Sequence, residues 1–95
     1  MKASDVLIVA KALISSPKKW CKGEFDQPGD KHCPQGAILT VAETLEDREP
    51  SFRARSYLMK VVGITTSWND APERTHDEVM VAFDKAIELA KRDED

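Results

Sequence analysis

The spacing of the apolar residues is the strongest constraint on the fold, because they recur every three or four positions in four segments. This is the spacing of one face of an α-helix, whereas a half-buried strand would alternate apolar and polar residues. The β-branched stretch 60–66 is where a strand is the main alternative. The predicted buried faces are Val6, Val9, Ala10, Leu13 and Ile14; Ala37, Ile38, Val41, Ala42 and Leu45; Phe52, Tyr57, Leu58, Met59, Val61 and Val62; and Val79, Phe83, Ala86, Ile87 and Ala90.

Prolines and small polar residues predict the bounds of the first two helices. Ser4 can cap a helix that starts at Asp5, and Pro17 follows the end of that helix. Pro34 suits the first position of a second helix, because its ring fixes φ and it has no N–H to leave unpaired. Cys33 therefore falls at or beside the N-cap of the second helix.

The third and fourth helices have similar markers. The polar run 46–50 ends in a proline and predicts a connector, after which Ser51 can cap a third helix. Gly63 suits the positive φ that commonly ends a helix. Thr75 and Glu78 match a capping box, in which each side chain accepts a backbone N–H at the start of the fourth helix.

The sequence therefore predicts a compact all-α bundle of about four helices. Its 95 residues suffice for one hydrophobic core, so we expect a single domain over residues 1–92 and a frayed acidic tail at 93–95. Two ordered loops are predicted, and each carries one tryptophan, Trp20 or Trp68. Pro28-Gly29 predicts a turn in the first loop.

The charge balance limits the possible partners. The chain has 14 basic and 17 acidic residues and a net charge of −3, which argues against binding to nucleic acid or anionic membranes and is compatible with a basic protein partner. No apolar run approaches the roughly 20 residues of a membrane span, and no signal peptide is apparent. We therefore expect a cytoplasmic protein whose two cysteines, Cys21 and Cys33, are free thiols. A disulfide between them is the alternative for an oxidising compartment.

Three motifs resemble those of an uncharacterised family of small bacterial and phage proteins. In that family they appear as W-x-x-G, C-x-x-G-A-[I/L] and W-N-D-x-P-x-R-T-x-x-E-V. The resemblance covers the chain from Trp20 to the last predicted helix. It implies no activity, cofactor or catalytic residue, although occurrence in phages favours an accessory or host-interaction role. The matching residues are Trp20 and Gly23, then Cys33 to Ile38, then Trp68 to Thr75 with Glu78 and Val79.

Cys33 is the strongest candidate for a reactive residue, because the N-terminus of a helix favours a thiolate and lowers the thiol pKa. His76 could act as its base if the N-termini of the second and fourth helices meet. Asp70 or Asn69 could then orient that histidine, as in Cys-His-Asp and Cys-His-Asn sites of acyl transfer. The ordinary interpretation, which we favour, is a small buried cysteine beside Gly36 and Ala37, both small enough to let another backbone come close.

A metal site is not predicted. Zinc prefers thiolate and imidazole ligands, and the chain has four of them, but their spacing matches none of the usual paired-ligand patterns. No cofactor is predicted either. The four residues are Cys21, His32, Cys33 and His76.

The two tryptophans are candidates for a binding surface. They could form an aromatic pocket in which Asn69 and Asp70 contact a ligand. In the interpretation that we favour, Trp68 anchors its loop in the core while Asn69 and Asp70 hydrogen-bond to nearby backbone in Asx turns. Arg74 could pair with Asp70, with Glu78 or with a carboxylate across the bundle. The predicted binding residues are Trp20, Trp68, Arg74 and His76.

No activity can be assigned from these features. The favoured hypothesis is a small non-enzymatic binding or regulatory protein that contacts another protein near Trp20 and Trp68. It rests on the lack of a phosphate-binding glycine loop, a paired-carboxylate spacing or a metal motif. The alternatives are a cysteine-dependent enzyme that uses Cys33 with His76 and Asp70 or Asn69, and a phage-encoded inhibitor of a host defence or replication system.

Overall fold

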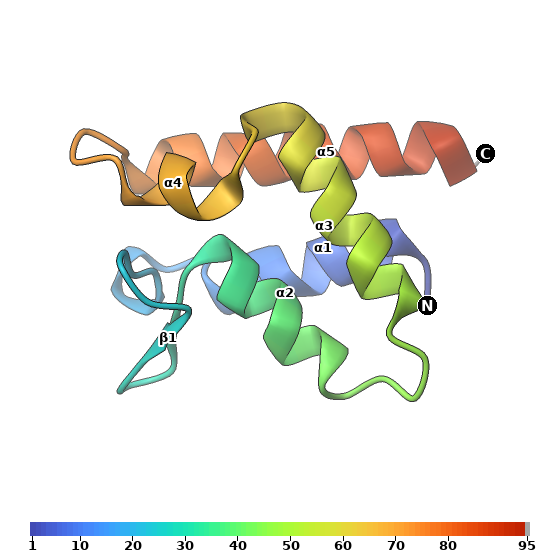
Figure 1. The fold of residues 1–95 in the computed structure, drawn as a ribbon, viewed down its shortest axis with the longest axis horizontal. Coiled ribbons are helices and arrows are strands. Elements are labelled where there is room, and N and C mark those ends of the chain that lie inside the picture. The colour runs from blue at the N-terminus through green and yellow to red at the C-terminus, as the bar shows by residue number, and fades with distance from the viewer. Residues whose placement is uncertain (95) are drawn as a thin grey trace.

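The computed structural model describes residues 1–94 and confirms the predicted all-α class (Figure 1). It also contains an antiparallel two-stranded hairpin that the sequence did not predict. Asp95, the last residue of the predicted tail, lies outside the described residues. The elements are α1 (Ala3–Leu13), the 3-10 helix η1 (Pro17–Lys19), β1 (Asp26–Gln27), β2 (Lys31–His32), α2 (Pro34–Ala42), α3 (Glu49–Val62), α4 (Thr65–Asp70) and α5 (His76–Glu94).

One hydrophobic cluster holds the four longer helices together. Figure 1 shows α1 and α5 lying lengthwise while α2 and α3 run obliquely to them, and α1 packs against all three of the others. Val9, predicted to be buried, is 41% exposed, because Leu7 takes the core position on that turn. The fully buried residues of α1 still follow the helical period, at Ala3, Val6, Leu7 and Ala10, with Ile14 directly after the helix.

Ser4 and Glu94 tie the first turn of α1 to the last turn of α5. Ser4, predicted to cap the first helix, lies inside α1, and its N–H and Oγ donate to the Glu94 carboxylate at 3.1 and 2.7 Å. Tyr57 Oη donates to Asp93 Oδ2 at 2.8 Å. Residues 93 and 94, which the sequence placed in the tail, continue α5 in the structure, and both side chains bond to other helices.

The start of α3 also differs from the prediction. The helix begins at Glu49, whose N–H donates to Asp47 Oδ1 at 3.0 Å. Pro50 is tolerated in the first turn because a proline needs no N–H acceptor there. Ser51, predicted as the cap, is consequently inside the helix and buried, while Phe52, predicted to be buried, is 63% exposed.

The predicted loop around Trp68 is a short helix. Gly63 has the expected positive φ, 79°, and ends α3. The chain then enters α4, which includes Trp68, so only Trp20 lies in a loop as predicted. The alternative strand at 60–66 is also wrong, because α3 continues through Val62.

The capping box at the start of α5 is confirmed. Thr75 N–H donates to Glu78 Oε1 at 2.9 Å, and Glu78 N–H donates to Thr75 Oγ1 at 3.2 Å. The Thr75 N–H and the Thr75 hydroxyl both donate to the Glu78 carboxylate, and these two bonds lower the pKa of that carboxyl below its usual value. α5 then extends for 19 residues with one apolar stripe, and among residues 1–94 no helix has the length and apolarity to cross a membrane.

Candidate functional site

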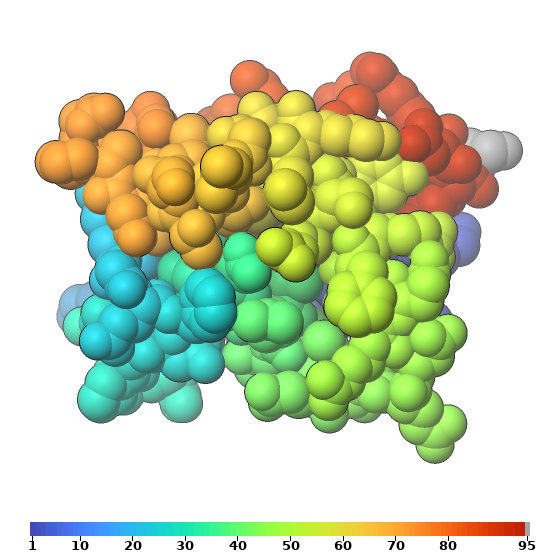
Figure 2. Space-filling view, viewed as in Figure 1, coloured from blue at the N-terminus to red at the C-terminus, as the bar shows by residue number. Residues whose placement is uncertain are grey.

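The candidate site lies where residues 20–33, which we call the hairpin segment, meet α4. Figure 2 shows the blue-to-teal atoms of this segment beside the yellow-orange atoms of α4. Within the segment, Asp26 pairs with His32 and Gln27 with Lys31 across the hairpin. The turn predicted at Pro28-Gly29 is confirmed by the positive φ of Gly29, 87°. Strands of two residues are too short to show an alternating pattern, which is why the sequence did not indicate them.

The hairpin segment is held against the first turn of α2. Cys33 is the N-cap of α2 as predicted, and its N–H donates to Phe25 O at 2.9 Å. A Cβ atom at Gly36 would lie only 2.0 Å from the same carbonyl oxygen. The expectation that Gly36 lets another backbone come close is therefore confirmed, and the neighbour is the backbone of Phe25.

α4 is joined to the hairpin segment by its last two polar side chains. Asn69 is fully buried; its Oδ1 accepts from Trp20 Nε1 at 2.7 Å and its Nδ2 donates to Cys21 O at 3.0 Å. Asp70 Oδ1 accepts the N–H of Gly23 at 2.8 Å. The interpretation of these residues as local Asx turns is wrong, because both bond across to a segment far away in the sequence.

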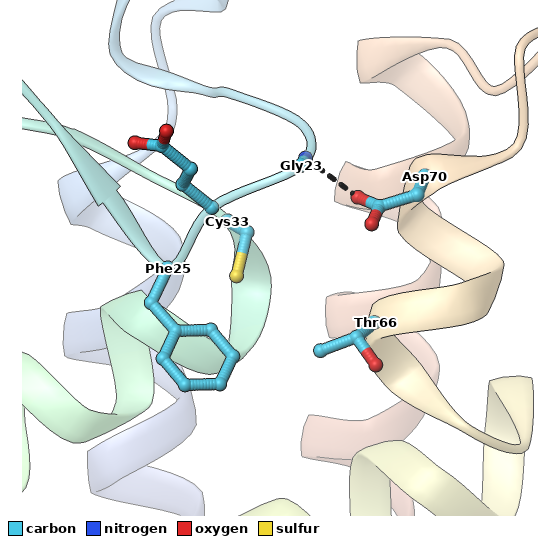
Figure 3. Close-up of a pocket in the computed structure, with 6 residues that line it drawn as sticks. Gly23, Phe25, Cys33, Thr66 and Asp70 are labelled. Carbon is cyan, nitrogen blue, oxygen red and sulfur yellow. Dashed lines mark hydrogen bonds between the residues drawn. The ribbon is translucent and has the colours of Figure 1, made fainter.

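A pocket with a cavity volume of about 470 Å³, which we call the Cys33 pocket, opens between the two segments (Figure 3). Figure 3 shows the sulfur of Cys33 pointing into the space between the Phe25 ring and Thr66, with Asp70 above them. This volume lies within the range of about 300–1,000 Å³ typical of ligand pockets. The lining residues are Gly23, Glu24, Phe25, Cys33, Thr66 and Asp70.

The thiol of Cys33 is protonated at neutral pH, because its surroundings raise its pKa. Burial raises the pKa of Cys33 above that of an ordinary thiol, whereas the N–H groups of Gly36 and Gln35 at the start of α2 lower it by a smaller amount. The negative charges of Asp70 and Asp26 raise the pKa of Cys33 further. The lowering expected from the helix N-terminus is thus present but outweighed, because burial and the two negative charges together raise the pKa by more.

His76 lies outside the Cys33 pocket. Its Nε2 is 2.8 Å from Ile14 O, so it donates to the carbonyl just after α1, and its ring packs against Trp20 with centroids 5.8 Å apart. Among residues 1–94, His76 makes no hydrogen bond to Cys33 or Asp70. The structure therefore brings Cys33 and Asp70 to one pocket but places His76, the proposed base, outside it at the start of α5.

Trp68 and Arg74 form a separate pair. The guanidinium carbon of Arg74 lies 4.2 Å from the centroid of the Trp68 ring, and Arg74 Nε donates to Trp68 O at 2.9 Å. Arg74 Nη1 also pairs with Glu78 at 3.0 Å, which is one of the pairings that the sequence suggested. The four predicted binding residues thus occupy two sets, Trp20 with His76 and Trp68 with Arg74, and neither set lines the Cys33 pocket.

Cys21 and Cys33 are both free and buried. Burial also raises the pKa of Cys21, and the neighbouring Cys33 raises it further. Within residues 1–94, no three His, Cys, Asp or Glu side chains gather where they could share a metal ion.

Three pocket residues were missed at the level of the sequence, namely Glu24, Phe25 and Thr66. Phe25 carried a weak signal, since an isolated aromatic residue in a polar loop has no helical face to join. Thr66 carried none, because its role depends on α4 turning toward a segment more than thirty positions earlier. Gly23 lies in the first motif, and its N–H is the group that Asp70 accepts.

The reactivity of Cys33 can be tested directly in a Cys21→Ser variant, where it is the remaining thiol. Because its pKa is raised, we expect alkylation by iodoacetamide to be slow at neutral pH and to keep accelerating above about pH 8.5, the ordinary thiol value. The rate is measured by mass spectrometry against the same variant in urea. A rate that reaches its plateau below about pH 8 would reveal an activated thiolate and contradict this prediction.

Comparison with protein families gives a match over most of the chain. The model of a family described as Family of unknown function (DUF6197) matches residues 1–89, which include the hairpin segment, α4 and most of α5. No curated protein and no solved structure matches the chain. The match therefore assigns a family but no activity, and any function has to be argued from the site itself.

Proposed function

We propose that this chain, which belongs to the DUF6197 family, is a non-enzymatic binding protein whose Cys33 pocket receives a cationic side chain of a partner protein. The observation that carries the proposal is the charge of the pocket. Two carboxylates, Glu24 and Asp70, line it, and no Lys or Arg of the described residues does. A lysine or arginine side chain is the protein group that such a pocket attracts most strongly.

The polar groups of the pocket have capacity left for a ligand. Asp70 uses Oδ1 to accept from Gly23, and its other oxygen has no hydrogen-bond partner within the described residues. The charges of Asp70 and Asp26 both act on the Cys33 sulfur, so both carboxylates favour a positive charge near that point. A lysine or arginine head group near the Cys33 sulfur would therefore be attracted by both Asp70 and Asp26.

Phe25 adds an apolar wall. Its side chain is 46% exposed, and its ring faces the space that the Cys33 sulfur points into (Figure 3). The methylene stem of a lysine or arginine can pack on such a ring while the charged head reaches a carboxylate. Since Gly23, Glu24 and Asp70 at the rim are also exposed, the backbone of a partner can follow its side chain to the surface.

The features of Cys33 disfavour the alternative of a cysteine-dependent enzyme. Its thiol is protonated at neutral pH, and the proposed base, His76, does not line the pocket. An inhibitor of a host defence or replication system would be a special case of the proposed binding protein. Capture of one dominant host protein through the Cys33 pocket would identify that case.

The proposal is tested with a library of random short peptides displayed on phage and selected against the wild-type protein. We expect enriched peptides to carry Lys or Arg next to an apolar residue. For a synthetic peptide from this set, Asp70→Asn should weaken binding by about two- to fivefold, because an exposed ion pair contributes about 0.2–1 kcal/mol. Asn can still accept the Gly23 N–H, so the fold is preserved. Binding is measured by calorimetry at low salt, where exposed charges are least screened.

A matched control removes a carboxylate elsewhere. Glu46→Gln makes the same change in net charge outside the pocket and should leave the affinity unchanged. Enrichment of peptides without a basic residue, or equal affinity for Asp70→Asn and the wild type, would overturn the proposal. Cys33→Ser should keep binding, whereas a loss of about fivefold or more, roughly 1 kcal/mol, in a folded variant would indicate that the thiol itself is required.

A further inference from the structure

A second concave surface lies between α2 and α3, on the face shown in Figure 2, where the green atoms of α2 meet the yellow-green atoms of α3. We call it the α2/α3 groove. Its cavity has a volume of only about 80 Å³ and is lined by apolar side chains from both helices, two of which, Leu39 and Phe52, are exposed. Large exposed apolar side chains around a cavity are typical of contact surfaces for other proteins. The apolar lining residues are Ile38, Leu39, Ala42 and Phe52.

The groove contains a buried hydroxyl without a partner. Ser51 is 4% exposed, and its Oγ makes no hydrogen bond within the described residues. A buried polar group left unpaired costs about 1–3 kcal/mol, so such groups are uncommon unless something satisfies them. The Ser51 Oγ is also closed to solvent, so a partner on the surface does not reach it, and the proposed contact does not involve this hydroxyl.

Two arginines flank the groove without counter-charges. Arg48 and Arg55 both line it, are exposed, and form no ion pair with any residue from 1 to 94. This is unusual in the chain, because Arg53, Arg74 and Arg92 each pair with a glutamate four positions away. The groove is therefore a local basic site on a protein whose net charge is −3.

We propose that the α2/α3 groove docks an acidic, amphipathic segment of a partner protein. One aliphatic side chain of that segment fills the cavity, and a neighbouring carboxylate lies between Arg48 and Arg55. The cavity is far smaller than the roughly 300–1,000 Å³ of small-molecule sites, so it suits a single side chain held by a longer chain. Arginine binds carboxylates well because its planar guanidinium can donate two parallel hydrogen bonds.

This groove is independent of the Cys33 pocket, because the two sites have opposite charge and share no lining residue. Variants in one site therefore leave the other intact. Failure of the basic-peptide experiment at Asp70 would say nothing about the α2/α3 groove, and the reverse also holds.

The probe is a synthetic amphipathic peptide with leucine and glutamate on one helical face, compared with a peptide in which every glutamate is glutamine. Binding is followed by NMR through the amide signals of Leu39, Ser51 and Phe52. We expect shifts with the glutamate peptide, and a loss of affinity of about two- to fivefold for Arg48→Gln and for Arg55→Gln. Arg53→Gln is the matched control on the same helix and should leave the affinity unchanged.

Ser51→Ala is a second control. Because the hydroxyl has no partner and is closed to solvent, its removal should leave the stability of the free protein unchanged or raised and should leave the affinity for the glutamate peptide unchanged. Equal binding of the two peptides, no shift at the three amides, or an equal loss in Arg53→Gln would overturn the proposal. Self-association in sedimentation that Phe52→Ser abolishes would also overturn it, since the groove would then be occupied by a second copy of the chain.

Discussion

Replacing Gly36 with alanine is expected to destabilise the protein by about 3 kcal/mol, at the upper end of the cost of overpacking. The added Cβ would lie 2.0 Å from Phe25 O and 2.6 Å from Phe25 C, and backbone atoms cannot rotate away as a side chain can. The same carbonyl accepts the N–H of Cys33, so moving it weakens that bond as well. The free energy of unfolding is measured by urea denaturation.

The test is informative because the expected change in stability has the opposite sign to the usual effect of replacing glycine with alanine in a helix. In the interior of a helix, replacing glycine with alanine normally stabilises by about 0.5–1 kcal/mol, so only the contact with Phe25 can reverse it. Gly29→Ala is the control, because Gly29 has a positive φ but nothing within 4 Å of the added atom, and it should cost only the strain of that conformation. A stabilised Gly36→Ala protein would show that the hairpin segment does not pack on α2 as described.

The features predicted correctly from the sequence are those that depend on neighbouring residues. The capping box of Thr75 and Glu78, the N-cap position of Cys33 and the positive φ of Gly63 each involve groups within a few positions of one another. Backbone geometry and the free N–H groups of a helix end determine such contacts almost alone. Such contacts can therefore be recognised from the residue types at neighbouring positions of the sequence.

The features that were missed depend on distant contacts. α4 has only six residues and no repeating apolar face. Asn69 connects it to Trp20 and Cys21, which lie 49 and 48 positions earlier in the sequence. Ser51 and Phe52 were misassigned because the side chain of Asp47 starts α3 two residues before the expected cap. The same applies to the candidate site, since the raised pKa of Cys33 comes from burial and from the charges of Asp70 and Asp26, which no local pattern contains.

Replacing Asn69 with leucine is expected to destabilise the protein by about 3 kcal/mol and to loosen the Cys33 pocket. Asn69 is fully buried and makes one bond to Trp20 Nε1 and one to Cys21 O. Leucine of similar size fills the space but leaves a buried donor and a buried acceptor without partners, at about 1–3 kcal/mol each. The loss of stability is measured by urea denaturation. A fall in tryptophan fluorescence anisotropy is the local readout of a loosened Trp20 side chain.

Asn69→Asp gives the matched test, because it keeps the shape and the acceptor for Trp20 but loses the donor to Cys21 O. A buried carboxylate beside a carbonyl oxygen prefers to be protonated, so its pKa in the folded state should lie above the unfolded value. The folded state then binds more protons than the unfolded state, and the stability of this variant should rise as the pH falls from about 7 to about 5. Asn69→Leu, which cannot titrate, should show the pH dependence of the wild type. If both variants followed the wild-type profile and lost less than about 1 kcal/mol, the two hydrogen bonds could not be what positions α4 against the hairpin segment.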